Sequence, residues 1–294
     1  MSAPTSVGRK INREGVVLLG WGRAILLQVA HPLVAAAVSE FSDFNQGAAG
    51  YLRRVHRTVG GMLAITFGTP EQAQAVIDRI NGIHDEVHGA LPEATGPFPA
   101  GTRYSARDPE LLLWVHATLV DSMLVTYERL VGSLSPAERD AFCIEAADTA
   151  MRLGVPAELI PRTHDALARY LDRTQRAGEI VVTPVARIIA TALLSPPLGP
   201  PGMPLAALSR LVTIGLLPAP IRLGYGFEWN ARRDRKFRVV MGLIRRTRWA
   251  LPPMLREWRV ARASEKASGR ASGEASGKAS EEHRKGIGRA STLR

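Results

Sequence analysis

The sequence predicts an all-α protein with a single multi-helix domain, residues 12–260, and a disordered C-terminal tail, residues 263–294. Three observations predict this class. Apolar residues recur at intervals of three and four before the tail, capping residues precede prolines where helices would begin, and no run alternates apolar and polar residues as a half-buried strand does. The 294 residues, 46% of them hydrophobic, are enough to form a packed core.

The apolar periodicity defines the helices in order. We expect them over residues 12–30, 33–39, 50–67, 70–89, 108–131, 136–153, 164–176, 183–194, 205–216 and 232–248. Three of them begin with a capping residue followed by proline, at Thr69-Pro70, Asp108-Pro109 and Ser135-Pro136. This order favours a helix start, because the capping side chain accepts from a free N–H group and proline has none to satisfy.

The end of the chain differs from the rest in composition and charge. From Ala263 it repeats Ala-Ser-Gly with charged residues between, and such a segment buries too little surface to offset its ordering entropy. The net charge of +11 is concentrated just before this tail, where residues 232–262 carry eleven Lys or Arg and two acids. Residues 1–231 carry 20 basic and 21 acidic groups. The basicity is therefore a property of the C-terminal region.

Several classes of protein are disfavoured by missing features. The single cysteine, Cys143, excludes an internal disulfide and a thiolate metal centre. The chain has no Gly-Lys-Ser/Thr phosphate loop and no Gly-x-Ser-x-Gly nucleophile motif. The apolar run 24–39 is short for a membrane span, and residues 188–209 contain five prolines. Because residues 1–10 lack an apolar segment and a cleavage site, we expect a cytoplasmic protein.

Histidines on apolar helix faces are the first candidate site residues. His84 lies within the apolar stripe of its predicted helix, and His31 and His116 have similar surroundings. The spacing of His84 and His88 resembles a zinc protease helix, but Asp85 stands where that motif needs glutamate. A buried imidazole needs partners for both ring nitrogens, which a metal or a backbone carbonyl supplies. Periodicity alone favours the carbonyl, a structural histidine in the core.

The second candidate cluster is Arg54, Arg57 and Thr58, which fall at i, i+3 and i+4 on one helix face. The helix continues as Met62 and Ile65, in a register that indicates an inward face. Two adjacent cations facing the core would need an anion, such as a haem propionate or another carboxylate. The alternative is a solvated basic face.

These residues belong to stretches that resemble the oxygenase MpaB family, which includes the latex-clearing proteins or rubber oxygenases. The resemblance covers about residues 12–258 and is carried by Asn12-Arg13-Glu14-Gly15, by residues 28–35, by Arg54-Val55-His56-Arg57-Thr58, by Ile83-His84, by residues 104–122 with Trp114-Val115-His116-Ala117-Thr118, and by Gly215-Leu216-Leu217-Pro218. It implies a globin-like helical domain that binds haem b through iron. In the rubber-cleaving members it also implies insertion of dioxygen across a carbon–carbon double bond.

Carried onto this chain, the resemblance places the proximal iron ligand on His84 and the distal side on Arg54 and Thr58, with His31 and His116 beside the cofactor. Arg57 stands where the family's rubber-cleaving members have a lysine that can ligate iron. Guanidinium has no free lone pair, so a lysine-closed state and polymer cleavage are not expected here. The expected partners are dioxygen and an apolar alkene, isoprenoid or lipid.

Two alternatives from other classes stay open. The same fold could be a non-catalytic haem carrier or sensor, which would bind oxygen without turnover. The basic C-terminal region could instead bind nucleic acid or an anionic membrane, through side chains that include Arg232, Arg233, Arg235, Lys236, Arg238, Trp249 and Trp258. Without a recognised nucleic-acid module, nucleic acid is the weaker partner. A peripheral contact at the inner membrane surface is compatible with a lipophilic substrate. The sequence does not determine the oligomeric state.

Overall fold

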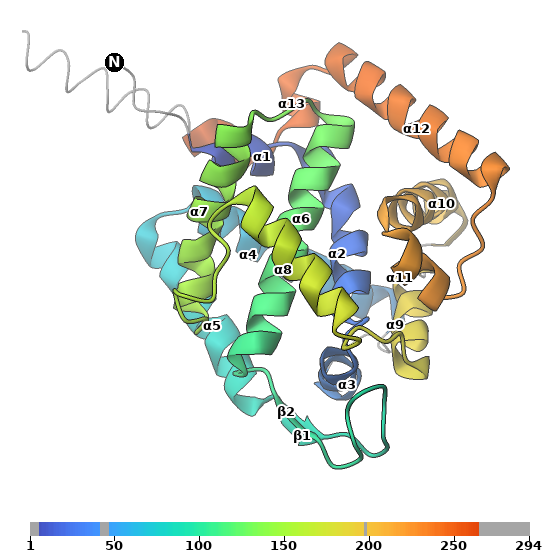
Figure 1. Cartoon of the computed structure of the whole chain (residues 1–294). Coiled ribbons are helices and arrows are strands. Elements are labelled where there is room, and N and C mark those ends of the chain that lie inside the picture. The colour runs from blue at the N-terminus through green and yellow to red at the C-terminus, as the bar shows by residue number, and fades with distance from the viewer. Residues whose placement is uncertain (1–5, 42–46, 197–198, 265–294) are drawn as a thin grey trace, which may run out of the picture.

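The fold was described from a computed structural model that defines residues 6–41, 47–196 and 199–264. The described residues form the mostly helical protein that the sequence predicts (Figure 1). The predicted tail from residue 265 onward lies outside the described residues. The globin-like arrangement that the resemblance implies stays a prediction.

The elements follow one another as α1 Val7–Asn12, the 3-10 helix η1 Gly15–Gly20, α2 Trp21–Gln28, α3 Pro32–Phe41, α4 Gly47–Phe67, α5 Pro70–Glu86, β1 His88–Ala90, β2 Arg103–Ser105, α6 Pro109–Leu130, α7 Pro136–Arg152, α8 His164–Arg176, α9 Pro184–Leu194, α10 Gly199–Leu216, α11 Ala219–Gly224, α12 Ala231–Ala250 and α13 Pro253–Arg256. The three predicted caps are confirmed. Thr69, Asp108 and Ser135 each accept a hydrogen bond from the first turn of the helix that follows.

The structure differs from the prediction at the first helix, which is divided into α1, η1 and α2. Glu14 has an extended backbone, and the glycines that follow lower helix propensity. These glycines permit close approach. A Cβ on Gly20 would lie 2.0 Å from Thr126 Oγ1, and one on Gly22 would lie 2.2 Å from Thr213 Oγ1. The break therefore lets this segment pack closely against α6 and α10.

Strands are the second difference, because the sequence shows no alternating run. β1 and β2 form an antiparallel pair in which His88 is opposite Ser105 and Ala90 is opposite Arg103. Each strand has three residues, which is too few for alternation to be visible in the sequence. The short helices α11 and α13 were missed for the same reason of length.

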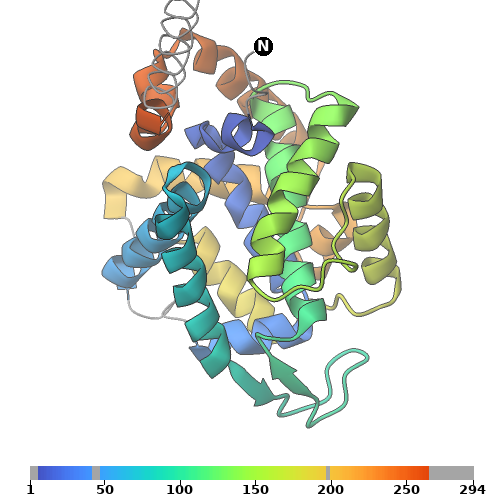
Figure 2. The ribbon, with the colours of Figure 1, turned by 90° about the vertical axis from the view of Figure 1, so that its left-hand side faces the viewer.

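The core is organised around α6. Trp114 and Leu124 are almost fully buried, and α2, η1, α7, α8 and α12 all contact this helix. Figure 2 shows α6 and α7 running side by side, with the β1–β2 hairpin at one end of the molecule. Thr118, Ser122 and Thr126 are buried on α6, and each donates its hydroxyl to a carbonyl of the preceding turn. The core therefore holds these hydroxyl groups without unpaired donors.

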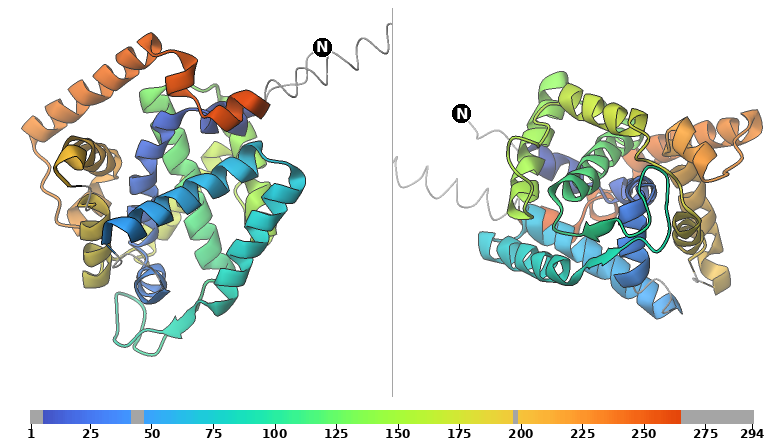
Figure 3. Two further views of the ribbon diagram at one scale, coloured as in Figure 1. Left: turned by 180° about the vertical axis from the view of Figure 1, so that it is seen from behind. Right: turned by 60° about the horizontal axis from the view of Figure 1, so that its bottom comes forward.

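Helices α4 and α5 form a V whose vertex is the short turn between Phe67 and Pro70 (Figure 3, left). Near the vertex the arms touch, because a Cβ on Gly61 would lie 3.4 Å from the side chain of Val76. Arg54 on α4 and Ile83 on α5 lie further from the vertex than this contact, and each is about equally far along its own helix. The two predicted site segments therefore occupy corresponding levels of the two arms.

Within the described residues, no single helix has the length and apolar composition to cross a bilayer. The consecutive segments Gly15–Gln28 and Pro32–Glu40 pass this composition test only together, and they are bent by 108°.

Candidate functional site

His84 lies in the last turn of α5 and is partly buried. Its Nδ1 atom is buried and has no hydrogen-bond partner. A structural histidine bonded to a carbonyl would have a partner on its buried nitrogen, and a buried polar atom without one is costly. The geometry of His84 therefore differs from the structural interpretation that periodicity alone favoured.

The end of α5 is fixed by Arg107, which follows β2. The guanidinium group donates to Asp85 Oδ1 over 2.7 Å and to Asn81 Oδ1 over 2.8 Å. The Asn81 amide in turn donates to the carbonyl of Arg152 over 3.0 Å. These bonds join the end of α5 to Arg107, which follows β2, and to Arg152, the last residue of α7. The backbone that carries His84 is therefore held from two sides.

The same surroundings affect the charge state of His84. Burial lowers its pKa below 6.5, the positive charge of Arg107 lowers it further, and Asp85 opposes this shift. A lower pKa means that the imidazole is neutral at pH 7 and keeps a lone pair. A neutral imidazole is the form that binds a metal ion.

His31 has the geometry of a structural histidine. Only 5% of the residue is exposed, and its Nδ1 accepts from the backbone N–H of Leu33 over 3.3 Å. The ring lies against Phe98 with centroids 5.3 Å apart. Burial lowers its pKa to about 4, against the opposing charge of Asp108. His31 therefore fixes the junction between α2 and α3 as a neutral hydrogen-bond acceptor.

His116 lies on α6 and is partly exposed, and burial lowers its pKa to about 4 as well. The described residues contain no group of three His, Cys, Asp or Glu side chains that could hold a metal ion. The three predicted histidines thus do not form a metal centre of their own. A histidine ligand here would have to act as the single protein ligand, as in a haem site.

The distal candidates lie on α4. Arg57 and Thr58 are exposed, and the side chain of Arg54 lies outside the described residues. The structure therefore differs from the inward face predicted for this segment. Residues 55–58 are all exposed, although four consecutive positions point in all directions around a helix. The extrapolation from Met62 and Ile65 does not hold at Arg57 and Thr58, because all four side chains from 55 to 58 are exposed.

Large apolar side chains are uncovered on both arms of the V. Val55 on α4 is 39% exposed, and Ile83 on α5 is 45% exposed. The sequence placed Ile83 in the buried stripe of its helix together with Val76, and only Val76 is buried. Val55 adjoins Arg54 in the sequence and Ile83 adjoins His84, so an exposed apolar side chain lies beside each predicted site segment.

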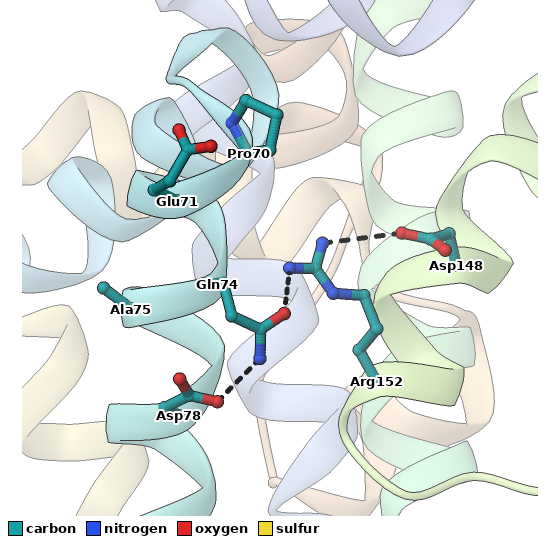
Figure 4. Close-up of a pocket in the computed structure, with 7 residues that line it drawn as sticks. All are labelled: Pro70, Glu71, Gln74, Ala75, Asp78, Asp148 and Arg152. Carbon is teal, nitrogen blue, oxygen red and sulfur yellow. Dashed lines mark hydrogen bonds and ion pairs between the residues drawn. The ribbon is translucent and has the colours of Figure 1, made fainter.

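Two hollows lie away from these residues. A groove of about 660 Å³ between α5 and α7 is lined by Pro70, Glu71, Gln74, Ala75, Asp78, Asp148 and Arg152 (Figure 4). There Arg152 donates to Gln74 over 2.7 Å and lies 3.6 Å from Asp148. The groove is lined mainly by polar side chains and runs along α5 from Pro70 to Asp78, without including His84. It does not fit an apolar substrate.

The second hollow, of about 230 Å³, lies between α2, α6 and α8. It contains a buried ion pair in which the Arg23 guanidinium lies 2.7 Å from Asp121 Oδ2. Trp114 and Thr118 line it from α6. His116 follows Trp114 by two residues, which places it on the opposite side of that helix. This hollow is therefore separate from the histidine candidates.

Arg107 is the site residue that sequence reasoning missed. It lies within residues 104–122 of the resemblance, but its partners Asn81 and Asp85 precede it by 26 and 22 positions, so no local pattern pairs them. The β1–β2 hairpin that brings them together is too short to be predicted. Cys143, by contrast, is buried as a small apolar side chain, and burial raises the pKa of its thiol to about 11. A thiol at that pKa is not a nucleophile at pH 7.

The fold and the site together define a helical protein with a neutral, partly buried histidine beside an exposed apolar side chain. Comparison with known proteins gives the family. The family described as ER-bound oxygenase mpaB/B'/Rubber oxygenase, catalytic domain, matches residues 8–246, and the chain belongs to it. This membership confirms the resemblance seen in the sequence and implies an oxygenase.

Two similar proteins come from Mycobacterium bovis and Mycobacterium tuberculosis, and both are described as uncharacterized. Each is 26% identical over 225 residues, which cover 75% of this chain and 84% of the relative. No solved structure matches the chain significantly.

Proposed function

We propose that the protein is a haem-b-dependent oxygenase that acts on an apolar alkene, isoprenoid or lipid, with His84 as the protein's iron ligand. The observation that carries the proposal is the partly buried His84 side chain, whose Nδ1 has no partner within the chain. Its lowered pKa supports the proposal, because a neutral imidazole donates its lone pair to iron without first losing a proton.

The residues of the V fit the other requirements of such a group. Haem b, when bound, supplies a redox-active iron that binds dioxygen. Arg57 and Thr58 are exposed on α4, where a guanidinium group and a hydroxyl can bind an anionic carboxylate. Val55 and Ile83 present apolar surface at matching levels, and such surface excludes water from an apolar substrate. Arg54 retains its predicted distal role as part of this proposal.

Arg107 acts in this proposal as a positioning residue. It holds Asp85 and Asn81, and its charge adds to burial in lowering the pKa of His84. His31 supports the fold beside the site through its bond to Leu33. His116 lies on α6, where it is partly exposed, and we place it among the residues that line the cofactor region.

The haem content of the purified protein tests this proposal. We expect a Soret band in the wild type and its loss in His84→Gly, with recovery of the band when imidazole is added in place of the missing side chain. His88→Gly is the matched control, because His88 is exposed four residues further along and should leave haem bound. His31→Ala should lower stability while haem content is retained.

These measurements test the cofactor and the iron ligand separately. A wild type without haem would overturn the cofactor, and a haem-free His88→Gly beside a haem-loaded His84→Gly would overturn the ligand. Consumption of oxygen with an unsaturated lipid distinguishes an oxygenase from a carrier or sensor, which binds oxygen without consuming it.

A further inference from the structure

The outer face of α12 combines cations with exposed apolar side chains. One stripe of this helix, spaced by three and four residues, is exposed along its whole length; it comprises Arg232, Arg235, Lys236, Val239, Leu243, Arg246 and Trp249. We call this set the outer stripe. Val239 is 64% exposed, Leu243 58% and Trp249 67%. The helix lies along one edge of the molecule (Figure 1), so this face is not covered by the other described elements.

The opposite face of α12 holds the helix to the domain. Phe237 and Met241 are buried, and Phe237 lies so close to Gly215 of α10 that a Cβ there would be 2.4 Å from the ring. At the end of the helix, Arg248 donates two hydrogen bonds to the buried carboxylate of Glu14. The orientation of α12 is therefore fixed by its inner face, and the outer stripe is not available to complete the core.

Within the part of the chain that the structure describes, no ion pair joins the cations of the outer stripe to an acid. Residues 232–262 contain two acids, and both are engaged elsewhere. Asp234 pairs with Arg238 over 2.9 Å, and the buried Glu257 accepts from Arg13 and Arg256. The positive charge of the stripe is therefore uncompensated within this region, which favours an anionic partner.

The apolar side chains decide which anionic partner fits. Beyond the helix the exposed apolar surface continues at Leu251, 44% exposed, and Met254, 64% exposed. The guanidinium groups of Arg248 and Arg256 lie over the ring of Trp249, at 4.7 Å and 5.8 Å from its centroid. Helices with Lys and Arg beside Trp and Leu lie in the interface of a bilayer, whereas phosphate contacts of nucleic acids do not need exposed Leu or Val.

We propose that the outer stripe of α12, continued by Leu251 and Met254, is a docking surface for an anionic lipid bilayer. The cations contact lipid phosphate and carboxylate groups, while Val239, Leu243 and Trp249 enter the boundary between headgroups and acyl chains. The helix remains folded on its inner face throughout. This surface does not depend on the haem assignment, since none of its residues belongs to the V of α4 and α5.

The test is cosedimentation of the full chain with phosphatidylcholine vesicles, with and without phosphatidylserine. Three substitutions, Arg235→Gln, Lys236→Gln and Arg246→Gln, should together reduce partitioning onto the anionic vesicles roughly a hundredfold, since each cation near such a surface contributes about fivefold. The matched control removes three exposed cations elsewhere, Arg79→Gln, Arg129→Gln and Arg169→Gln, and should have much less effect. Thermal unfolding verifies that both triple variants are folded.

A second variant separates a bilayer from a purely electrostatic partner. Leu243→Ser with Trp249→Ser keeps every cation and should weaken vesicle binding at least tenfold, because two apolar side chains no longer leave water. Equal loss in the two triple variants would overturn the proposal, because the binding would then be a matter of net charge. Full vesicle binding by the Leu243→Ser/Trp249→Ser variant, with tight salt-dependent binding to duplex DNA, would overturn it in favour of nucleic acid.

Discussion

Acidification should destabilise the protein through its two most perturbed histidines. Burial lowers the pKa of His31 and of His116 from 6.5 to about 4. Because the pKa of each is lower in the folded protein than in the unfolded chain, the unfolded chain binds more protons between these values. The free energy of unfolding therefore falls as the pH is lowered from about 6.5 toward 4.

The size of the effect follows from the two pKa values. At pH 5 an unfolded histidine is almost fully protonated, whereas a folded one with a pKa of about 4 is almost fully neutral. Each such histidine therefore lowers the free energy of unfolding by roughly 2 kcal/mol at pH 5 relative to pH 8. Two such sites lower the free energy of unfolding by about 4 kcal/mol, a large part of the 5–15 kcal/mol typical of a domain. His84 adds to this in the same direction, because its pKa is also lowered.

Urea unfolding between pH 8 and pH 5 measures this slope. His116→Gln removes a titrating group and should reduce the loss of stability on acidification by roughly 2 kcal/mol. The control is His88→Gln, which removes an exposed imidazole and tests whether loss of any histidine alters the slope. If His116→Gln kept the full wild-type slope, the imidazole would titrate normally in the folded state, and our account of its burial would be wrong.

Two further predictions concern packing and the charge on His84. Gly22→Ala should lower the free energy of unfolding, measured with denaturant, by about 1–3 kcal/mol, because its Cβ would lie 2.2 Å from Thr213 Oγ1. The control is Gly60→Ala, which has no neighbour within 4 Å and should be neutral or stabilising. A stable Gly22→Ala would show that α2 and α10 do not approach as closely as described. Arg107→Gln should raise the pKa of His84 in an NMR titration, since the guanidinium charge lowers it, and Arg103→Gln, which removes an exposed guanidinium group nearby in the sequence, should not. An unchanged His84 titration in Arg107→Gln would contradict the positioning role.

Local chemistry explains which parts of the fold could be predicted from the sequence. The starts of α5, α6 and α7 depend on a capping side chain and the proline after it, and both lie within four residues of the helix. The break after Asn12 coincides instead with an isolated antiparallel bridge between Glu14 and Glu257, and further along Thr126 and Thr213 leave no room for a side chain at Gly20 and Gly22; all of these partners are distant in sequence. A window of neighbouring residues contains no information about such contacts.

The candidate site shows the same limit. The position of His84 on a helix face follows from periodicity, but the pairing of Arg107 with Asp85 depends on the register of β1 and β2. The exposure of Arg57 and Thr58 could not be predicted either. Periodicity indicates which side of a helix is apolar, and it does not show where along its length the helix leaves the core.

The contrast between His31 and His84 shows what sequence pattern leaves undecided. Both are partly or fully buried histidines in apolar segments, and burial lowers the pKa of each. At His31 the backbone N–H of Leu33 occupies Nδ1, so the neutral ring completes a turn of the chain. At His84 the buried Nδ1 has no such partner, and the helix that carries it is fixed instead through Asp85 and Asn81. A histidine whose backbone is anchored by its neighbours while its own ring is not engaged is positioned for a ligand from outside the chain, and this difference is why the iron assignment rests on His84.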